Sequence, residues 1–263
     1  MKQTGAKGTY AAPAIERAFE IIEALAQHPE GALVSEIAAM LGRSVGELFR
    51  FFVVMERLGY LRKSAANDRY TVTYKFLEVA YRATPAQDIV RAALPAMQGL
   101  AQEAGQSCHL VVPNAGAGLV IACEQQPGMR GFSLRLGARI DIVNSCSGQV
   151  LLAFSPAQRV GQIIADAEQL RGAPVDRDWL GERLALIRER GYDSRQSPIT
   201  HGVTDISCPV FGFDGHVAAA LTIPFLELID GSQKVHLEAA RAMLHQTVAR
   251  ISDALGYQAD RGA

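Results

Sequence analysis

Cysteine is scarce in this sequence and shows no paired spacing. The 263 residues contain four cysteines, Cys108, Cys123, Cys146 and Cys208, and no CxxC motif. A disulfide framework or a structural zinc site normally needs paired cysteines. We therefore expect reduced, buried thiols in a cytoplasmic protein.

Long apolar segments are also lacking. No run of about 18 uncharged apolar residues occurs, so the sequence predicts no membrane span. The first residues, MKQTGAKGTYAAP, carry lysines without an apolar segment behind them, which is unlike a secretory signal. We expect residues 1–13 to form a flexible, mildly basic arm.

Motifs for catalysis, nucleotides and metals are absent as well. The six histidines show neither HxxxH nor HExxH spacing, and there is no GxGxxG or GxxxxGK[ST] motif. Cys108 and His109 are neighbours on a predicted strand, where adjacent side chains point to opposite faces, so they form no dyad. The sequence thus predicts no enzyme, no metal site and no cofactor.

Basic residues are concentrated in one stretch, although the net charge of the chain is −1. Residues 43–75 carry seven basic and three acidic side chains, whereas residues 76–263 carry 16 basic and 19 acidic ones. A local basic surplus attracts a phosphate backbone. This surplus is small, so it supports nucleic-acid binding only together with a suitable fold.

The stretch Ser35–Thr73 predicts such a fold. A short helix, Ser35–Gly42, ends at a glycine, which suits the left-handed backbone common just after a helix. Ser44 and Glu47 form the capping-box pattern that begins a second helix, Ser44–Leu58. Apolar residues at helical spacing give this second helix one apolar face, namely Leu48, Phe51, Phe52, Met55 and Leu58.

Two predicted strands follow this helix pair. Gly59–Lys63 and Arg69–Thr73 flank a turn at Ser64–Asp68 and would form a wing. With a preceding helix, Ala14–Gln27, the order is that of a winged helix-turn-helix whose second helix enters a DNA major groove. The expected core of this domain is Ile15, Phe19, Ile22, Leu25, Ile37, Leu41, Leu48, Phe52 and Met55.

Helical patterns continue after the wing. Tyr74–Arg82 and Ala86–Gly105 have helical spacing, and Pro95 within the second favours a kink or a break. Residues 76–105 are therefore a predicted helical linker between two domains.

Residues 106–258 mix strands and helices. The Asp214-Gly215 pair between two apolar runs indicates a β-hairpin. Mixed strands and returning helices predict an α+β domain with a largely antiparallel sheet. Expected strands are Ser107–Val112, Leu119–Cys123, Gly131–Leu136, Ala138–Val143, Asp205–Phe213 and His216–Pro224. Expected helices are Ser147–Phe154, Pro156–Ala165, Asp178–Glu189 and Gly231–Leu255.

Seven segments of the chain together carry a family resemblance: AIERAFEIIEAL, SEIAAMLG, MERLGYL, RYTVTYKFLEVA, LGARIDIVNSCSGQVLLAF, IRERGYD and GVTDISCPVFGFDGHVAAALTI. Through them the chain resembles the IclR family of bacterial transcriptional regulators over roughly residues 12–256. The resemblance implies a winged helix-turn-helix (residues 14–75), a helical linker (76–105) and a GAF-like α+β effector-binding domain (106–258).

Three positions depart from the family pattern. Gly46-Glu47 stands where the family often has Ser-Thr, Val143 stands where it usually has His, and Gly148–Ala153 reads GQVLLA instead of GKALLA. The DNA sequence read and the ligand bound can therefore differ from those of other members.

The predicted recognition helix offers several candidate DNA contacts. Arg50 lies on the side away from the apolar face and suits guanine or phosphate. Phe49 points outward and suits a thymine methyl or a sugar, unless it tucks under the wing. Ser44, Gly46 and Glu47 lie at the helix start, where Ser44 and Glu47 serve as the cap or contact DNA.

Further DNA contacts are expected from the wing and the first helix. Arg62, Lys63, Asn67 and Arg69 would meet phosphates, with ordinary surface charge as the alternative. Arg17 and the arm lysines Lys2 and Lys7 would reach the DNA backbone or the minor groove.

The resemblance also implies an effector pocket between the sheet and the helix that begins near Cys146. A helix N-terminus favours an anion such as a carboxylate, and Arg195 could add charged hydrogen bonds. Alternatively, Cys146 and Thr222 belong to the core, and Asp205 and Arg195 form an internal ion pair. The matching pocket positions are Ile140, Cys146, Ser147, Arg195, Val203, Asp205 and Thr222.

The leading hypothesis is a ligand-responsive transcriptional regulator. It would bind a palindromic or pseudo-palindromic double-stranded operator as a homodimer or tetramer, because one winged helix reads few base pairs. A small organic effector would modulate this binding. The alternative is a small-molecule sensor that acts through protein–protein contacts.

Overall fold

The computed structural model describes residues 12–83, 86–126, 128, 131–198 and 200–258. The chain divides into two compact units, Met1–Thr84 and Pro85–Ala263. The predicted arm, including Lys2 and Lys7, lies almost entirely outside the described residues. Within the described ranges, every helix is too short or too polar to cross a bilayer.

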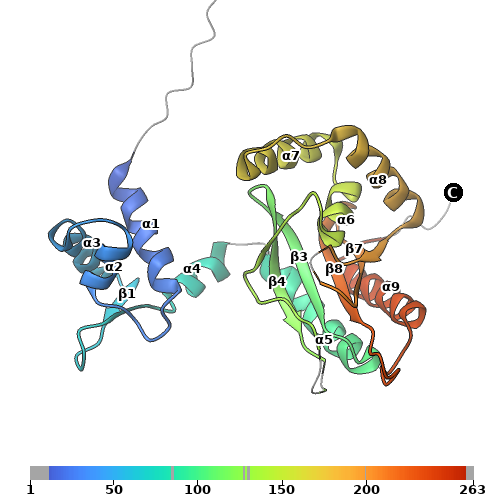
Figure 1. Ribbon diagram of the computed structural model, residues 1–263, viewed down its shortest axis with the longest axis horizontal. Helices are drawn as coiled ribbons and strands as arrows, with labels where there is room; N and C mark the ends of the chain where they lie inside the picture. The colour runs from blue at the N-terminus through green and yellow to red at the C-terminus, as the bar shows by residue number, and fades with distance from the viewer. Residues whose placement is uncertain (1–11, 84–85, 127, 129–130, 199, 259–263) are drawn as a thin grey trace, which may run out of the picture. The chain divides into compact units, whose positions relative to one another are not determined.

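The first unit is a winged helix-turn-helix, as predicted (Figure 1). Its elements are α1 (Pro13–Ala26), α2 (Val34–Met40), α3 (Val45–Arg57), β1 (Leu61–Lys63), β2 (Tyr70–Val72) and α4 (Lys75–Ala83). Ser44 is the N-cap of α3, and its hydroxyl accepts a hydrogen bond from the Glu47 N–H at 3.2 Å. Phe52 packs edge-on against Tyr70, with ring centroids 4.9 Å apart, and so joins α3 to the wing.

Part of the predicted core of this unit is wrong. Ile15 is 61% exposed and Phe19 is 56% exposed, whereas Ile21 and Leu25 are buried. Ile15 precedes Ile21, and Phe19 precedes Leu25, by six residues, which is about 120° around a helix. Leu58 is also half exposed, because it is the C-cap of α3 and lies beyond the apolar face of that helix.

The second unit is the predicted antiparallel α+β domain. Its described strands form a six-stranded sheet in the order β5-β4-β3-β8-β7-β6, and every neighbouring pair is antiparallel. The strands are β3 (Cys108–Asn114), β4 (Ala117–Glu124), β5 (Arg139–Ile140), β6 (Asp193–Gln196), β7 (Val203–Phe211) and β8 (Val217–Leu226).

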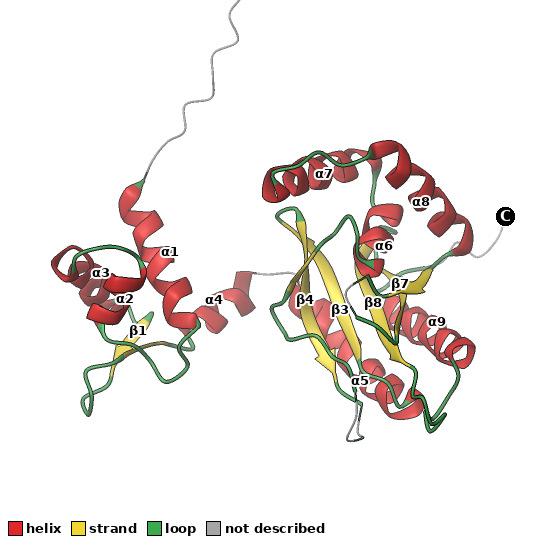
Figure 2. Cartoon of the chain, viewed as in Figure 1, coloured by secondary structure: helices red, strands yellow, loops and turns green. Residues whose placement is uncertain are grey.

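Helices cover both faces of this sheet (Figure 2). One face carries α5 (Ala86–Ala104) and α9 (Leu237–Ala254), and the other carries α6 (Cys146–Phe154). Behind α6 lie α7 (Ala157–Arg171) and α8 (Arg177–Arg190). Because it is sandwiched in this way, α6 is buried on all sides from Cys146 to Ala153.

Several predicted elements of this unit are wrong in detail. Residues 131–136 form no strand, and of Ala138–Val143 only Arg139 and Ile140 form a strand, which pairs with β4. The short polar strand β6 was not predicted, because its sequence DSRQ lacks apolar alternation. The last helix begins at Leu237, and α5 runs through Pro95 as one helix.

Gly148 allows α6 to approach the preceding loop closely. A Cβ at Gly148 would lie 2.2 Å from the carbonyl oxygen of Ile142 and 2.5 Å from its Cα. No side chain fits at these distances. The first turn of α6 can therefore pack this closely against Ile142 only because residue 148 is glycine.

Gly148→Ala is expected to lower the free energy of unfolding by about 1–3 kcal/mol, because the added methyl group overpacks a backbone contact. Gly161 in α7 is the matched control, since nothing lies within 4 Å of its Cβ position. Gly161→Ala should raise stability by about 0.5–1 kcal/mol through helix propensity. Urea unfolding measures both, and equal effects of the two substitutions would contradict this account of Gly148.

Candidate functional site

The outer face of α3 is open to solvent. Gly46 and Arg50 are exposed, and Phe49 is 51% exposed. The Arg50 guanidinium carbon lies 5.2 Å from the centre of the Phe51 ring, which supports the side chain without burying it. The helix therefore presents an arginine and an aromatic ring outward, as the sequence predicts.

Glu47 differs from the capping-box prediction. Its N–H donates to Ser44, but its carboxylate pairs with the Arg17 guanidinium on α1. This ion pair joins the start of α3 to α1. Arg17 and Glu47 thus hold the recognition helix, a role that their separation of 30 residues hides in the sequence.

The wing residues play different parts. Arg62 is exposed, and Lys63 is paired with Asp68 at 2.8 Å, an ion pair open to solvent. This hydrogen bond to Asp68 raises the pKa of Lys63. Asn67 accepts a hydrogen bond from the Arg69 N–H at 3.3 Å and so shapes the turn.

Arg69 is engaged within the domain. Its guanidinium donates to both carboxylate oxygens of Glu36 at 3.0 Å and to the Gly31 carbonyl at 2.9 Å. The Glu36 pKa is lowered, chiefly by the Leu33 N–H and also by Arg69. Arg69 therefore clamps α2 to β2, and its expected phosphate contact stays a prediction.

A cavity of about 650 Å³ opens between α6 and the sheet. Of the seven predicted effector residues, six line it: Ile140, Cys146, Ser147, Arg195, Asp205 and Thr222. Val203 is buried but is not among the lining residues, since it lies two residues, or about 6–7 Å, along β7 from Asp205.

The cavity also includes residues that the sequence reasoning missed. His109 lies on its floor, and apolar side chains line its walls. His109 stands out as a single ionisable residue in a buried strand, and that signal could have found it. The apolar wall residues are Phe132, Leu134, Ala138, Trp179 and Pro198.

A row of polar side chains crosses the sheet beneath this cavity. His109 pairs in register with Thr222, Thr222 with Ser207, and Ser207 with Asp193, on four successive strands. All four are buried, and the Thr222 hydroxyl donates to the Ser207 oxygen at 2.8 Å. Polar groups are costly on a buried floor unless something pairs with them.

Pairing in this region is incomplete. Among the described residues, four buried side-chain atoms lack a hydrogen-bond partner: His28 Nδ1, His109 Nδ1, Asp193 Oδ2 and Arg195 Nε. The last three lie at or beside the cavity. Asp193 Oδ2 and Arg195 Nε approach to 3.4 Å without hydrogen-bond alignment. Most buried polar groups in proteins have a hydrogen-bond partner, so these exceptions single out this region.

Arg195 and Asp205 do not form the ion pair that was the alternative to a pocket. Arg195 donates to the Asn144 carbonyl, just before α6, and pairs with Asp193. Asp193 is itself held by Arg183 at 2.8 Å. The Asp205 carboxylate therefore makes no hydrogen bond to any residue that the structure describes.

Burial sets the protonation states in the cavity. It raises the pKa of Asp205 to about 6, against the opposing effect of Arg195, and lowers the pKa of His109 to about 4. It also raises the pKa of the Cys146 thiol well above its usual value. Cys146 is therefore a neutral thiol and His109 a neutral imidazole at pH 7.

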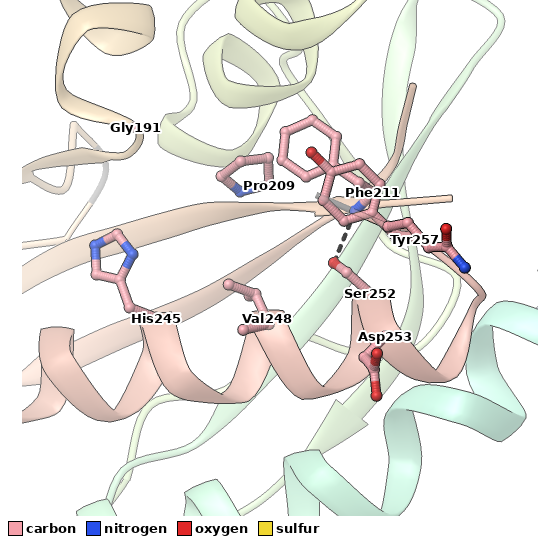
Figure 3. Close-up of a pocket in the computed structure, with 10 residues that line it drawn as sticks. Gly191, Pro209, Phe211, His245, Val248, Ser252, Asp253 and Tyr257 are labelled. Atoms are coloured by element: carbon pink, nitrogen blue, oxygen red, sulfur yellow. Dashed lines mark hydrogen bonds between the residues drawn. The ribbon is translucent and has the colours of Figure 1, made fainter. Parts of the chain in front are cut away.

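A second cavity, of about 870 Å³, follows the outer edge of β7 beside α9 (Figure 3). Its backbone groups are largely satisfied, because Pro209 has no N–H and the Phe211 N–H donates to the Ser252 hydroxyl at 3.0 Å. Tyr257 stacks on Phe211 at 5.0 Å. None of the unpaired buried atoms in the described residues lines this cavity, so the α6 cavity is the better candidate.

No group of three or more His, Cys, Asp or Glu residues within the described ranges is arranged to hold a metal ion.

A winged helix-turn-helix with an exposed recognition helix, joined in one chain to a domain with a ligand-sized cavity, defines the class of ligand-responsive DNA-binding regulators. The IclR helix-turn-helix domain matches residues 14–65, and the bacterial transcriptional regulator IclR C-terminal domain matches residues 81–253. The chain therefore belongs to the IclR family of bacterial transcriptional regulators, whose C-terminal domain binds an effector.

Relatives and solved structures agree. The HTH-type transcriptional regulator KdgR of Escherichia coli is 28% identical over 245 residues, covering 92% of both chains. The Thermotoga maritima IclR structure covers 92% of this chain and 98% of its own, with 24% identity and a TM-score of 0.67. An IclR homologue from Microbacterium hydrocarbonoxydans, complexed with 4-hydroxybenzoate, covers 92% and 98%, with 19% identity and a TM-score of 0.75.

Asp205→Asn is expected to raise the free energy of unfolding at pH 7.5 by roughly 1–2 kcal/mol. This value is lower than the full pKa shift implies, because solvent partly screens the carboxylate. The pKa of Asp205 is higher in the folded chain, about 6, than its ordinary 3.8. Its ionisation therefore costs stability as the pH rises from about 4 to 6.

The gain from Asp205→Asn should accordingly shrink as the pH falls from 7.5 to 4.5, measured by urea unfolding. Asp253→Asn, at an exposed position, provides the control for the loss of one carboxyl group. A gain at Asp205 that stays constant with pH would refute the assigned burial effect.

Proposed function

We propose that this regulator reads a palindromic operator through the outer face of α3 and responds to a small organic anion bound in the α6 cavity. The exposed Arg50 on α3 carries the first part. Gly46, Phe49 and Arg50 would meet base edges, while Ser44, Arg62 and Lys63 would meet phosphates. As a DNA-binding protein it would act in the cytoplasm, where bacterial DNA lies.

The anion would bind at the N-terminus of α6. Ser145 is the N-cap and accepts from the Gly148 N–H, which leaves the Cys146 and Ser147 N–H groups without a partner among the described residues. Such groups favour a carboxylate, and Arg195 adds positive charge beside them. His109 is only 4% exposed, and its Nδ1 has no hydrogen-bond partner. This nitrogen would bind another polar atom of the ligand.

The cavity walls suit an apolar or aromatic ligand body. Phe132, Leu134, Ile140 and Trp179 are among the apolar residues that line them. The Microbacterium homologue was solved with 4-hydroxybenzoate, a carboxylate on an aromatic ring, which supports this ligand class. The ligand would change operator affinity only by binding better to one of two states of the regulator, and the chain through α4 and α5 would connect the two sites.

We further propose a homodimer, or a tetramer built from dimers, as the DNA-bound form. Ile15 and Phe19 expose an apolar stripe on α1 that the domain itself leaves uncovered. A second copy of the same helix would bury this stripe and pair two recognition helices with two half-sites.

Arg50→Ala should weaken binding to the upstream intergenic DNA by about 10- to 100-fold and relax sequence preference, because a bidentate guanine contact is worth about 1–3 kcal/mol. Lys63→Ala should instead weaken binding to specific and unrelated DNA alike and flatten the salt dependence. Fluorescence anisotropy at several salt concentrations measures both. If the unaltered protein binds unrelated DNA equally well at physiological salt, specific regulation is excluded.

Phe19→Lys should weaken binding to a full palindrome by about tenfold or more, because a lost dimer contact removes the gain from linking two half-sites. Binding to an isolated half-site should stay unchanged, which controls for damage to the domain. Fluorescence anisotropy with the full palindrome and with the half-site measures both affinities. An equal loss on both DNAs would argue against the α1 contact.

A further inference from the structure

The α6 cavity places a positive and a negative side chain next to each other at its polar end. Arg195 on β6 and Asp205 on β7 are directly opposed in the sheet register, and both line the cavity. Side chains of opposed residues leave the sheet on the same face, about 5 Å apart. They nevertheless form no ion pair with each other, because Asp193 and the Asn144 carbonyl occupy Arg195.

The anion site and Asp205 are therefore neighbours. Arg195 reaches the residue just before the N-cap of α6, where the unpaired Cys146 and Ser147 N–H groups lie. The Cys146 sulfur also lies 3.7 Å from the Asp205 backbone carbonyl. A carboxylate bound at this helix end is consequently held close to the Asp205 side chain.

Two carboxylates at such a separation repel each other unless a proton donor lies between them. No described residue donates a hydrogen bond to the Asp205 carboxylate, and the Thr222 hydroxyl donates to Ser207. A donor on the ligand, close to its own carboxylate, would relieve this repulsion.

We propose that the effector is an organic acid with a hydrogen-bond donor, a hydroxyl or an ammonium group, on the carbon next to its carboxylate. The carboxylate lies at the N-terminus of α6 beside Arg195, and the neighbouring donor binds Asp205. The apolar walls hold the rest of the molecule. This inference rests on the proposed anion site and adds to it the chemistry of the adjacent carbon.

Four acids that share one phenyl body isolate this feature. Mandelate carries a hydroxyl on the carbon next to its carboxylate, and phenylglycine carries an ammonium group there. Phenylglyoxylate carries an oxo group at that carbon, and phenylacetate has only hydrogens. Isothermal titration calorimetry with the full chain at pH 8, where Asp205 is ionised, compares their dissociation constants.

One enantiomer of mandelate or of phenylglycine should bind at least about tenfold more tightly than phenylacetate and phenylglyoxylate, because a site built around a donor rejects analogues that lack it. The tighter of the two identifies the donor as hydroxyl or ammonium. Asp205→Val should abolish the preference, whereas Asp205→Asn should keep part of the preference for mandelate through its amide oxygen. The exposed Asp253 (Figure 3) gives the matched control, Asp253→Asn, which should leave all four constants unchanged.

Similar binding of all four acids, or a preference that survives Asp205→Val, would overturn the inference while leaving the anion site intact. Binding of none of the four would overturn both the adjacent donor and the anion site. The DNA-binding part of the proposed function is decided separately, by the Arg50 and half-site measurements.

Discussion

The effector domain depends on the close approach of α6 to the loop before it. Gly148 meets the Ile142 backbone at a distance that excludes any side chain, and this contact brings the N-terminus of α6 over the sheet. The helix is buried on all sides, and Cys146 and Ser147 of its first turn line the cavity. The position of this helix end at the cavity is thus a consequence of packing.

Most of the charged groups around this cavity are paired with one another, and one is not. Arg183 holds Asp193, Asp193 lies against Arg195, and Arg195 reaches the loop before α6. Asp205 is the member left without a partner, and burial raises its pKa to about 6. The half-buried Asp205 carboxylate is therefore open to contact from within the cavity.

The DNA-binding unit divides its basic residues in a comparable way. Arg17 and Arg69 are held by Glu47 and Glu36 and brace the helices, whereas Arg50 and Arg62 stay exposed. The basic surplus of the sequence therefore overstates the charge available to phosphates. The Arg17–Glu47 ion pair also fixes the start of α3 against α1, which gives its outer face a defined position.

The sequence by itself determined the local features: the Ser44 cap, the order of the winged helix, the antiparallel α+β domain and six of the seven cavity residues suggested by family resemblance. These follow from spacing within a few residues or from motifs. Only the tertiary structure decided which face of α1 is exposed, that Arg69 binds Glu36, and that His109 Nδ1 is buried on the cavity floor without a hydrogen-bond partner. The physical reason is that partners of charged and polar groups are set by strand register and layer packing between residues 30 or more positions apart, as for Arg17 and Glu47, which no local pattern records.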